Sequence, residues 1–140
     1  MRMIVMLAVL GGCVMSSSSN GMREDMREAQ DEAQVHVAES RTALDLPSLI
    51  SEVDRHSAHM TVILDDMRDH MSAMQHCSGT STMMNMRDGM QIEIENHQTT
   101  MHAMHDLALA RSEGEHHMIV MTGMLDDMDM QLDGMHCGGM

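Results

Sequence analysis

Apolar residues recur at alternating steps of four and three positions along much of the chain. Such spacing places residues on one face of an α-helix. The clearest stripe is Leu49, Val53, His56, Met60, Ile63, Met67, His70, Met74 and Cys77. Similar stripes comprise Ile94, His97, Met101, Met104 and Ala108; His117, Met121, Met124, Met128 and Met135; and, more weakly, Met22, Met26, Ala29, Ala33, His36 and Leu44. No long alternation of apolar and polar residues predicts a sheet.

An internal repeat relates these stripes to one another. When the chain is shifted by 61 residues, His36 falls on His97, His56 falls on His117, and the LDDM run at 64–67 falls on the one at 125–128. With one residue of slippage, the His-Cys pair at 76–77 also matches the pair at 136–137. Each copy, about 22–77 and 83–137, holds two stripes, so we expect an all-α, antiparallel four-helix bundle over 22–137, built from two repeated helical hairpins.

Glycine and proline suggest where the helices end. Pro47 would mark the first hairpin turn and Gly114 the second. The Ser-Gly-Thr-Ser stretch at 78–81 would separate the two hairpins and supply N-cap residues, and Gly138-Gly139 would end the last helix.

The amino-acid composition limits which residue types can form the core and which classes of function the chain can have. The 140 residues include 23 Met and 11 His but no Phe, Tyr or Trp, so a core must come from Met, Leu, Ile, Val and Ala. The formal charge of −14 and the absence of aromatic side chains argue against nucleic-acid binding. A negative surface raises the local concentration of cations, although any solvated acidic face does the same.

The N-terminus carries an export signal. Arg2 is followed by an apolar run at 3–10, too short to cross a bilayer, and then by Leu10-Gly11-Gly12-Cys13. This sequence resembles the lipobox of bacterial lipoproteins, which implies a signal peptide at 1–12 and a lipid on Cys13. Val14 in place of Asp fits anchoring to the outer membrane, facing the periplasm or the surface. The Ser-rich remainder of 13–21 would be a flexible tether. The alternative is an ordinary secretory signal whose cysteine is incidental.

Four histidines on the stripes are candidate metal ligands. If the hairpins turn near Pro47 and Ala108, then His36, His56, His97 and His117 meet in one core layer, which would suit Zn, Cu or Ni. If the turn lies nearer Leu49, the helices slide and the layer splits into mixed His/Met sites. The non-metal alternative is a buried polar layer that fixes the register of the bundle.

Methionine is the second candidate donor. Met60, Met67, Met101, Met104, Met121, Met124 and Met128 recur on the stripes. Thioether sulfur is a soft donor that suits Cu(I), and it persists where thiols oxidise. Methionine is equally a flexible core filler. Its excess over Leu favours metal binding in our interpretation.

Cys77 and Cys137 end the second helix of each repeat and should lie at the same pole of the bundle. In an oxidising compartment a disulfide is the first expectation, and a Cys/His metal site is the alternative. Such a disulfide would stabilise the bundle by about 2–4 kcal/mol.

No motif of enzymatic chemistry is present: CxxCH, GxSxG, HExxH, the P-loop and GxGxxG are all missing. The His-His-x-x-x-Met run at 116–121 resembles Met/His-rich four-helix periplasmic proteins associated with copper, over one helical turn. We therefore expect a non-enzymatic envelope lipoprotein that buffers or sequesters copper, or else zinc. The main alternative is a structural or interaction lipoprotein with a Met-filled core and no metal. A third, non-covalent b-type haem between a His and a Met, would show as a Soret band.

Overall fold

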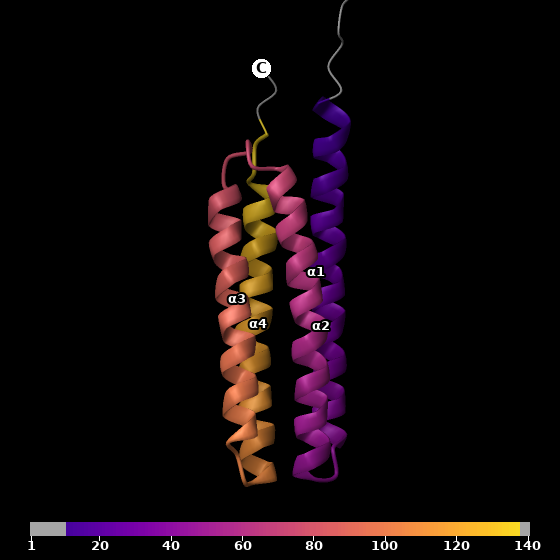
Figure 1. Cartoon of the computed structure of the whole chain (residues 1–140), viewed down its shortest axis with the longest axis vertical. Coiled ribbons are helices and arrows are strands. Elements are labelled where there is room, and N and C mark those ends of the chain that lie inside the picture. Colours follow the sequence, from indigo (N-terminus) through magenta and orange to yellow (C-terminus); the bar gives the residue numbers. More distant parts are fainter. Residues whose placement is uncertain (1–10, 138–140) are drawn as a thin grey trace, which may run out of the picture.

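Four long helices make up the fold (Figure 1). The computed structural model describes residues 11–137, with side chains from residue 17 on. The helices are α1 (Gly11–Thr42), α2 (Leu46–Ala73), α3 (Thr80–His102) and α4 (Leu107–Asp133). Each helix contacts its neighbours around the bundle, including α1 with α4, and this part of the chain contains no strand. The all-α four-helix bundle expected from the stripes is confirmed.

The two hairpin turns are set by aspartate N-caps. The Asp45 carboxylate accepts a hydrogen bond from the Ser48 backbone N–H at 2.8 Å, and its repeat partner Asp106 does the same for Leu109 at 2.8 Å. Each cap satisfies a backbone donor that the first helical turn leaves open. The turns therefore lie at 43–45 and 103–106, and Pro47 lies inside the first turn of α2.

Several expected boundaries were wrong. Gly114 lies inside α4 rather than at a turn, because an interior glycine costs a helix only about 1 kcal/mol. The last helix ends at Asp133 with Gly134 as its C-cap, and Gly138-Gly139 lies outside the described residues. The stretch 13–21, expected to be a tether, is helical and continuous with α1, since extending a helix is far easier than starting one.

Three expected stripe members also fall elsewhere. Leu44 belongs to the first turn and is 91% exposed, whereas the stripe placed it in the core. Ala108 belongs to α4, because α3 ends at His102. Met104 consequently lies in the turn after α3, half-buried.

The loop between α2 and α3 lies at the end of the bundle opposite the two hairpin turns. Gly79 adopts φ 88°, a left-handed conformation that favours glycine, and it serves as the N-cap of α3 without a side-chain hydrogen bond. The expected Ser or Thr cap is therefore absent here; instead the Thr80 hydroxyl donates to the Met74 carbonyl at 2.7 Å. Beside this loop Cys77 and Cys137 form a disulfide, with Cα atoms 4.2 Å apart. It joins the two hairpins at the pole where the sequence predicted it.

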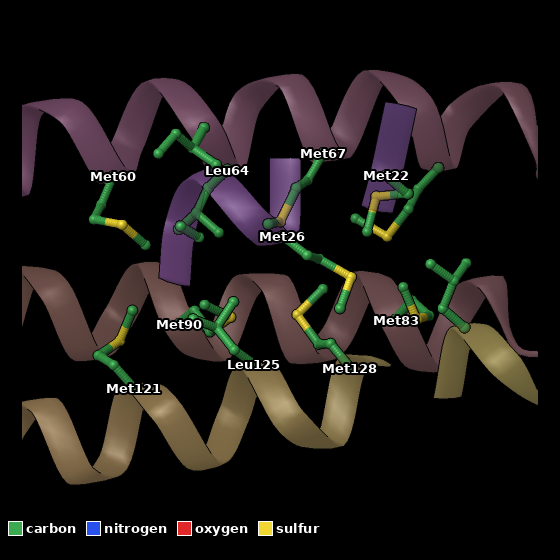
Figure 2. Packing of buried hydrophobic residues seen from close by; sticks show 14 of the residues in the cluster. Met22, Met26, Met60, Leu64, Met67, Met83, Met90, Met121, Leu125 and Met128 are labelled. Carbon is green, nitrogen blue, oxygen red and sulfur yellow. The ribbon is translucent and has the colours of Figure 1, made fainter. Parts of the chain in front are cut away.

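Methionine fills most of the core between this pole and the middle of the bundle. In Figure 2, Met60 and Met121 lie at one end of the view and Met22 and Met83 at the other, with Leu64 and Leu125 among the side chains between them. A smaller apolar cluster lies near the hairpin turns: Ala43, Leu49, Val53, Met101 and Ala110. Between the two clusters lies a polar layer.

Candidate metal centre

The polar layer consists of four histidines, one from each helix. His36, His56 and His117 are 0% exposed, and His97 is 2% exposed. The rings of His36 and His56 stack with centroids 4.0 Å apart, and those of His97 and His117 stack at 3.8 Å. The two stacks meet edge to face, with centroids 5.8 Å apart for His36–His97 and for His56–His117. All four predicted histidines therefore lie in one layer.

Side-chain direction brings these rings together despite the early turns. With the first turn near residue 44, His36 lies opposite Glu52 and His56 opposite Glu32, so the two histidines start about one helical turn apart. Because the Cα–Cβ bonds of a helix tilt towards its N-terminus, His36 leans away from the turn and His56 leans towards it. The rings meet between their backbones, and the same geometry recurs in the second hairpin.

Each histidine faces a glutamate of the helix with which it forms a hairpin. The Nδ1 atoms of His36 and His56 lie 3.1 Å from Glu52 Oε1 and 2.9 Å from Glu32 Oε1. In the second hairpin, His117 Nδ1 lies 3.0 Å from Glu93 Oε1, while His97 Nδ1 lies 4.0 Å from Glu113 Oε1. An ionised carboxylate only accepts hydrogen bonds, so the hydrogen-bonded Nδ1 atoms donate.

This pairing determines what the other ring nitrogen offers. A neutral imidazole that donates through Nδ1 carries a lone pair on Nε2. The Nε2 atoms of all four histidines are buried and have no hydrogen-bond partner among the described residues. A buried polar atom without a partner costs about 1–3 kcal/mol, and such atoms are rare in folded proteins. The layer therefore concentrates Lewis-basic nitrogen in the buried core, and His97, whose Nδ1 likewise lacks a hydrogen-bond partner among those residues, can offer either ring nitrogen.

His36, His97 and His117 stay neutral well below physiological pH. Burial, reinforced by the neighbouring imidazoles, lowers the pKa of His36 to about 4, that of His97 to about 3 and that of His117 to about 2. Protonation would place a cation in a low-dielectric layer beside other rings. At neutral pH these imidazoles are in the form that a metal requires.

None of the four glutamates was predicted from the sequence as part of the site. Glu32 and Glu93 are related by the same 61-residue shift, as are Glu52 and Glu113. Every helix consequently carries a Glu-x-x-x-His motif, in which the His belongs to the layer and the Glu supports the His of the hairpin partner. The fourfold recurrence of this spacing was the signal that could have revealed them.

The two halves of the site differ in their counter-charges. In the first hairpin Arg55 donates to both Glu32 and Glu52, at 2.8 and 2.7 Å, and His59 Nδ1 lies 2.7 Å from Glu32 Oε2. Burial opposes ionisation of Glu32, but hydrogen bonds from His56, Arg55 and His59 outweigh it and lower its pKa to about 2.

The second hairpin lacks this compensation. The residue equivalent to Arg55 is His116, which is exposed, and the one equivalent to His59 is Val120. Burial and the nearby Glu113 carboxylate raise the pKa of Glu93. Uncompensated negative charge therefore lies on the α3–α4 side of the layer.

The predicted methionine donors lie in three places. Met60, Met67, Met121 and Met128 are at most 1% exposed and belong to the core on the disulfide side of the histidines. Met101 is buried on the turn side, with Met104 packed against the same cluster. Met124 lies half-buried on the α3–α4 face beside Gly89, outside the inner row. Met60, Met101 and Met121 each follow a layer histidine by four residues, and Met118 directly follows His117.

With the side chains as they lie in the described residues, no group of three or more His, Cys, Asp or Glu is placed so that it could hold a metal ion. The expected signal peptide and lipidation site stay predictions, because residues 1–10 and the side chain of Cys13 lie outside the described part of the chain. Among the described helices, none has the length and apolar character needed to cross a membrane.

No protein-family model, curated protein or solved structure matches the chain.

Proposed function

We propose that this protein binds a borderline or soft metal ion in the four-histidine layer, with copper the best candidate and zinc the second. Its role would be to buffer or sequester the ion in the cell envelope, where a lipid on Cys13 would hold the protein at the membrane. The observation that carries the proposal is the set of four buried Nε2 atoms without partners. No protein donor reaches them, and a metal ion would use all four lone pairs.

The donor chemistry supports this function. Neutral imidazole suits Zn, Cu and Ni, and an Nδ1–H held by a carboxylate is the usual second interaction of a metal-bound histidine. Three of the four histidines have that hydrogen bond already. The rings are stacked in pairs, so binding would require them to rotate and aim Nε2 at a common centre.

The charge around the layer points in the same direction. Four glutamates face the histidines, and Arg55 is the one arginine that pairs with them in the described residues. A divalent cation at the layer would offset much of the remaining negative charge, most strongly beside Glu93 and Glu113. Met60 and Met121, at the next level of the core, would favour Cu(I) over harder ions.

A competition titration tests this function. The purified chain would be titrated without oxygen with Cu(I), and separately with Zn(II), against a chromogenic chelator. We expect tight binding that the double variant His56→Leu/His117→Leu abolishes and that the exposed-site control His76→Leu/His105→Leu retains. Met60→Leu/Met121→Leu should weaken Cu(I) more than Zn(II).

The same variants separate metal binding from a purely structural role. If the chain competes for neither metal, and if the core His→Leu variant unfolds at higher denaturant concentration, the layer serves only to fix the bundle register. The stacking of the rings in two pairs favours this structural role as the second candidate.

A further inference from the structure

The repeat is broken by residue size at several core positions. Small residues of α1, the first turn and α4 have larger equivalents under the 61-residue shift, on α3, the second turn and α2, and three of the small ones, Ala33, Ser40 and Gly114, line the α1–α4 seam. The pairs are Ala29 and Met90, Ala33 and Ile94, Ser40 and Met101, Ala43 and Met104, Ala110 and Leu49, and Gly114 and Val53. All twelve are buried except Met104, so the difference changes how the core is filled.

Two cavities lie along this seam, on either side of the histidine level. The larger, of about 420 Å³, is lined by Gln30, Ala33, Gln34, Val37, Ala38, Arg41, Met118 and Thr122. The smaller, of about 80 Å³, is lined by Val37, Ser40, Arg41, Arg111, Gly114 and Glu115. Ala33 and Val37 are within one turn of His36, and Met118 directly follows His117. Ala33, Val37 and Met118 are therefore the lining residues closest to His36 and His117 along the helices.

The opposite seam is closed by hydrogen bonds. Between α2 and α3, Arg87 Nε donates to the Leu64 carbonyl at 3.0 Å. Further along, Gln98 and His102 both reach the Asp54 carboxylate, at 2.8 and 2.7 Å. Large buried side chains, Val53 and Ile94, fill the space beside the histidines there. The α1–α4 seam is also bridged, by Arg23 with Asp133 and by Arg41 with Glu115, but no hydrogen bond of the described residues crosses it between these two pairs. The two sides therefore differ at the level of the histidines.

We propose that the α1–α4 seam is the route by which a metal ion enters and leaves the histidine layer, passing through the larger cavity between Ala33 and Met118. This proposal rests on the proposed function of the layer. Arg41 lines both cavities and pairs with Glu115 at 3.3 Å, so charge does not distinguish them. The larger one offers more space and also has the neutral polar groups of Gln30, Gln34 and Thr122, which can replace part of the ion's hydration.

Met118 forms the inner barrier on this route. It is 6% exposed, and its unbranched side chain has several rotatable bonds and a sulfur that can contact a soft ion in transit. Its equivalent under the shift is Ser57. Rotation of this one side chain would open the space beside His117 without separating the helices.

Exchange kinetics test the route. Stopped-flow mixing with Cu(II) alone would follow the imidazole-to-Cu(II) absorption, which no aromatic side chain obscures, and excess chelator would then measure release. Ala33→Ile, which installs the residue of the second repeat, should slow both uptake and release by about tenfold, which corresponds to about 1.4 kcal/mol in the barrier. The equilibrium affinity should change by less than about threefold, since the ligands are intact. Met118→Ala should accelerate both rates.

Matched controls make the outcome decisive. Ala58→Ile places the same change on an exposed position of α2, and Gly114→Val fills the smaller cavity with the residue of the first repeat; neither should alter the rates. Circular dichroism verifies that each variant is folded. Unchanged rates in both Ala33→Ile and Met118→Ala would overturn the route, and so would equal slowing by Gly114→Val. If the wild-type chain binds no copper or zinc, the proposed function itself fails, and the route with it.

Discussion

The two hairpins carry the same four-residue pattern at the histidine layer, yet they stabilise it differently. In the first, Glu32 and Glu52 share Arg55, and the Glu32 side chain is only 4% exposed. In the second, Glu93 and Glu113 have His116 where Arg55 would be, and their side chains are 27% and 30% exposed. One half has carboxylates bridged by an arginine, and in the other the carboxylates have no arginine partner among the described residues.

This difference assigns one role to each half of the duplicated bundle: the first holds the histidines in place, and the second attracts a cation. The first half supplies rigidity, because Arg55 locks two carboxylates and, through them, the orientation of His36 and His56. The second half keeps negative charge beside His97 and His117, which favours an incoming cation. A fully symmetric layer with two arginines would be more stable without metal and less attractive to it.

The largest expected effect is a loss of folding stability at low pH, which arises from the buried histidines that both halves contain. Folding lowers the pKa of His36, His97 and His117 from 6.5 to between about 4 and 2, so below pH 6.5 the unfolded chain binds more protons than the folded one. Their stabilising contribution is complete above about pH 6.5 and is lost as the pH falls. Each histidine accounts for about 1.4 kcal/mol per pH unit, or together up to about 5 kcal/mol between pH 7 and pH 5.

Denaturant unfolding followed by circular dichroism, with a metal chelator present, measures this loss. The variant His97→Leu/His117→Leu should remove most of the slope and thereby place the acid sensitivity in the second hairpin. Equal stability of the wild-type chain at pH 7 and pH 5 would show that the histidines are not held neutral by burial.

A smaller effect should distinguish the two halves directly. Arg55→Met leaves the Glu32 carboxylate buried without its bidentate partner, and we expect a loss of about 2–3 kcal/mol, moderated because Arg55 is itself 43% exposed. The matched change His116→Met should alter stability by less than about 0.5 kcal/mol. If both substitutions lower the free energy of unfolding by the same amount in denaturant titrations, the proposed difference between the two halves is wrong.

The smallest effect comes from making the second half resemble the first. His116→Arg should pair with Glu93 and Glu113 and stabilise the metal-free chain by about 1 kcal/mol, because these side chains are partly solvated. The added charge should also weaken metal binding in the competition titration. A gain of stability together with tighter metal binding would contradict the charge argument.

The helical hairpins and the histidine layer could be predicted because periodicity and the 61-residue shift act on many residues at once. The hairpin turns were misplaced by a few residues because Pro47 and Gly114 are strong local signals, whereas the Asp45 and Asp106 caps decided the helix starts. Glu32 and Glu93 were hidden among 22 acidic residues, and their role depends on which helix faces which. The difference in residue size along the α1–α4 seam could also have been read from the sequence, but only the structure shows that cavities lie beside the small residues.

The central claim is that a metal ion binds between the four histidines, and a crystal structure of the copper- or zinc-loaded protein tests it most directly. Anomalous scattering collected at the metal absorption edge would locate the ion. We predict one strong peak inside the bundle, with at least three of the four Nε2 atoms unstacked and at about 2.0–2.1 Å from it. Metal found only on surface side chains, with the rings of His36, His56, His97 and His117 still stacked in pairs, would contradict the account.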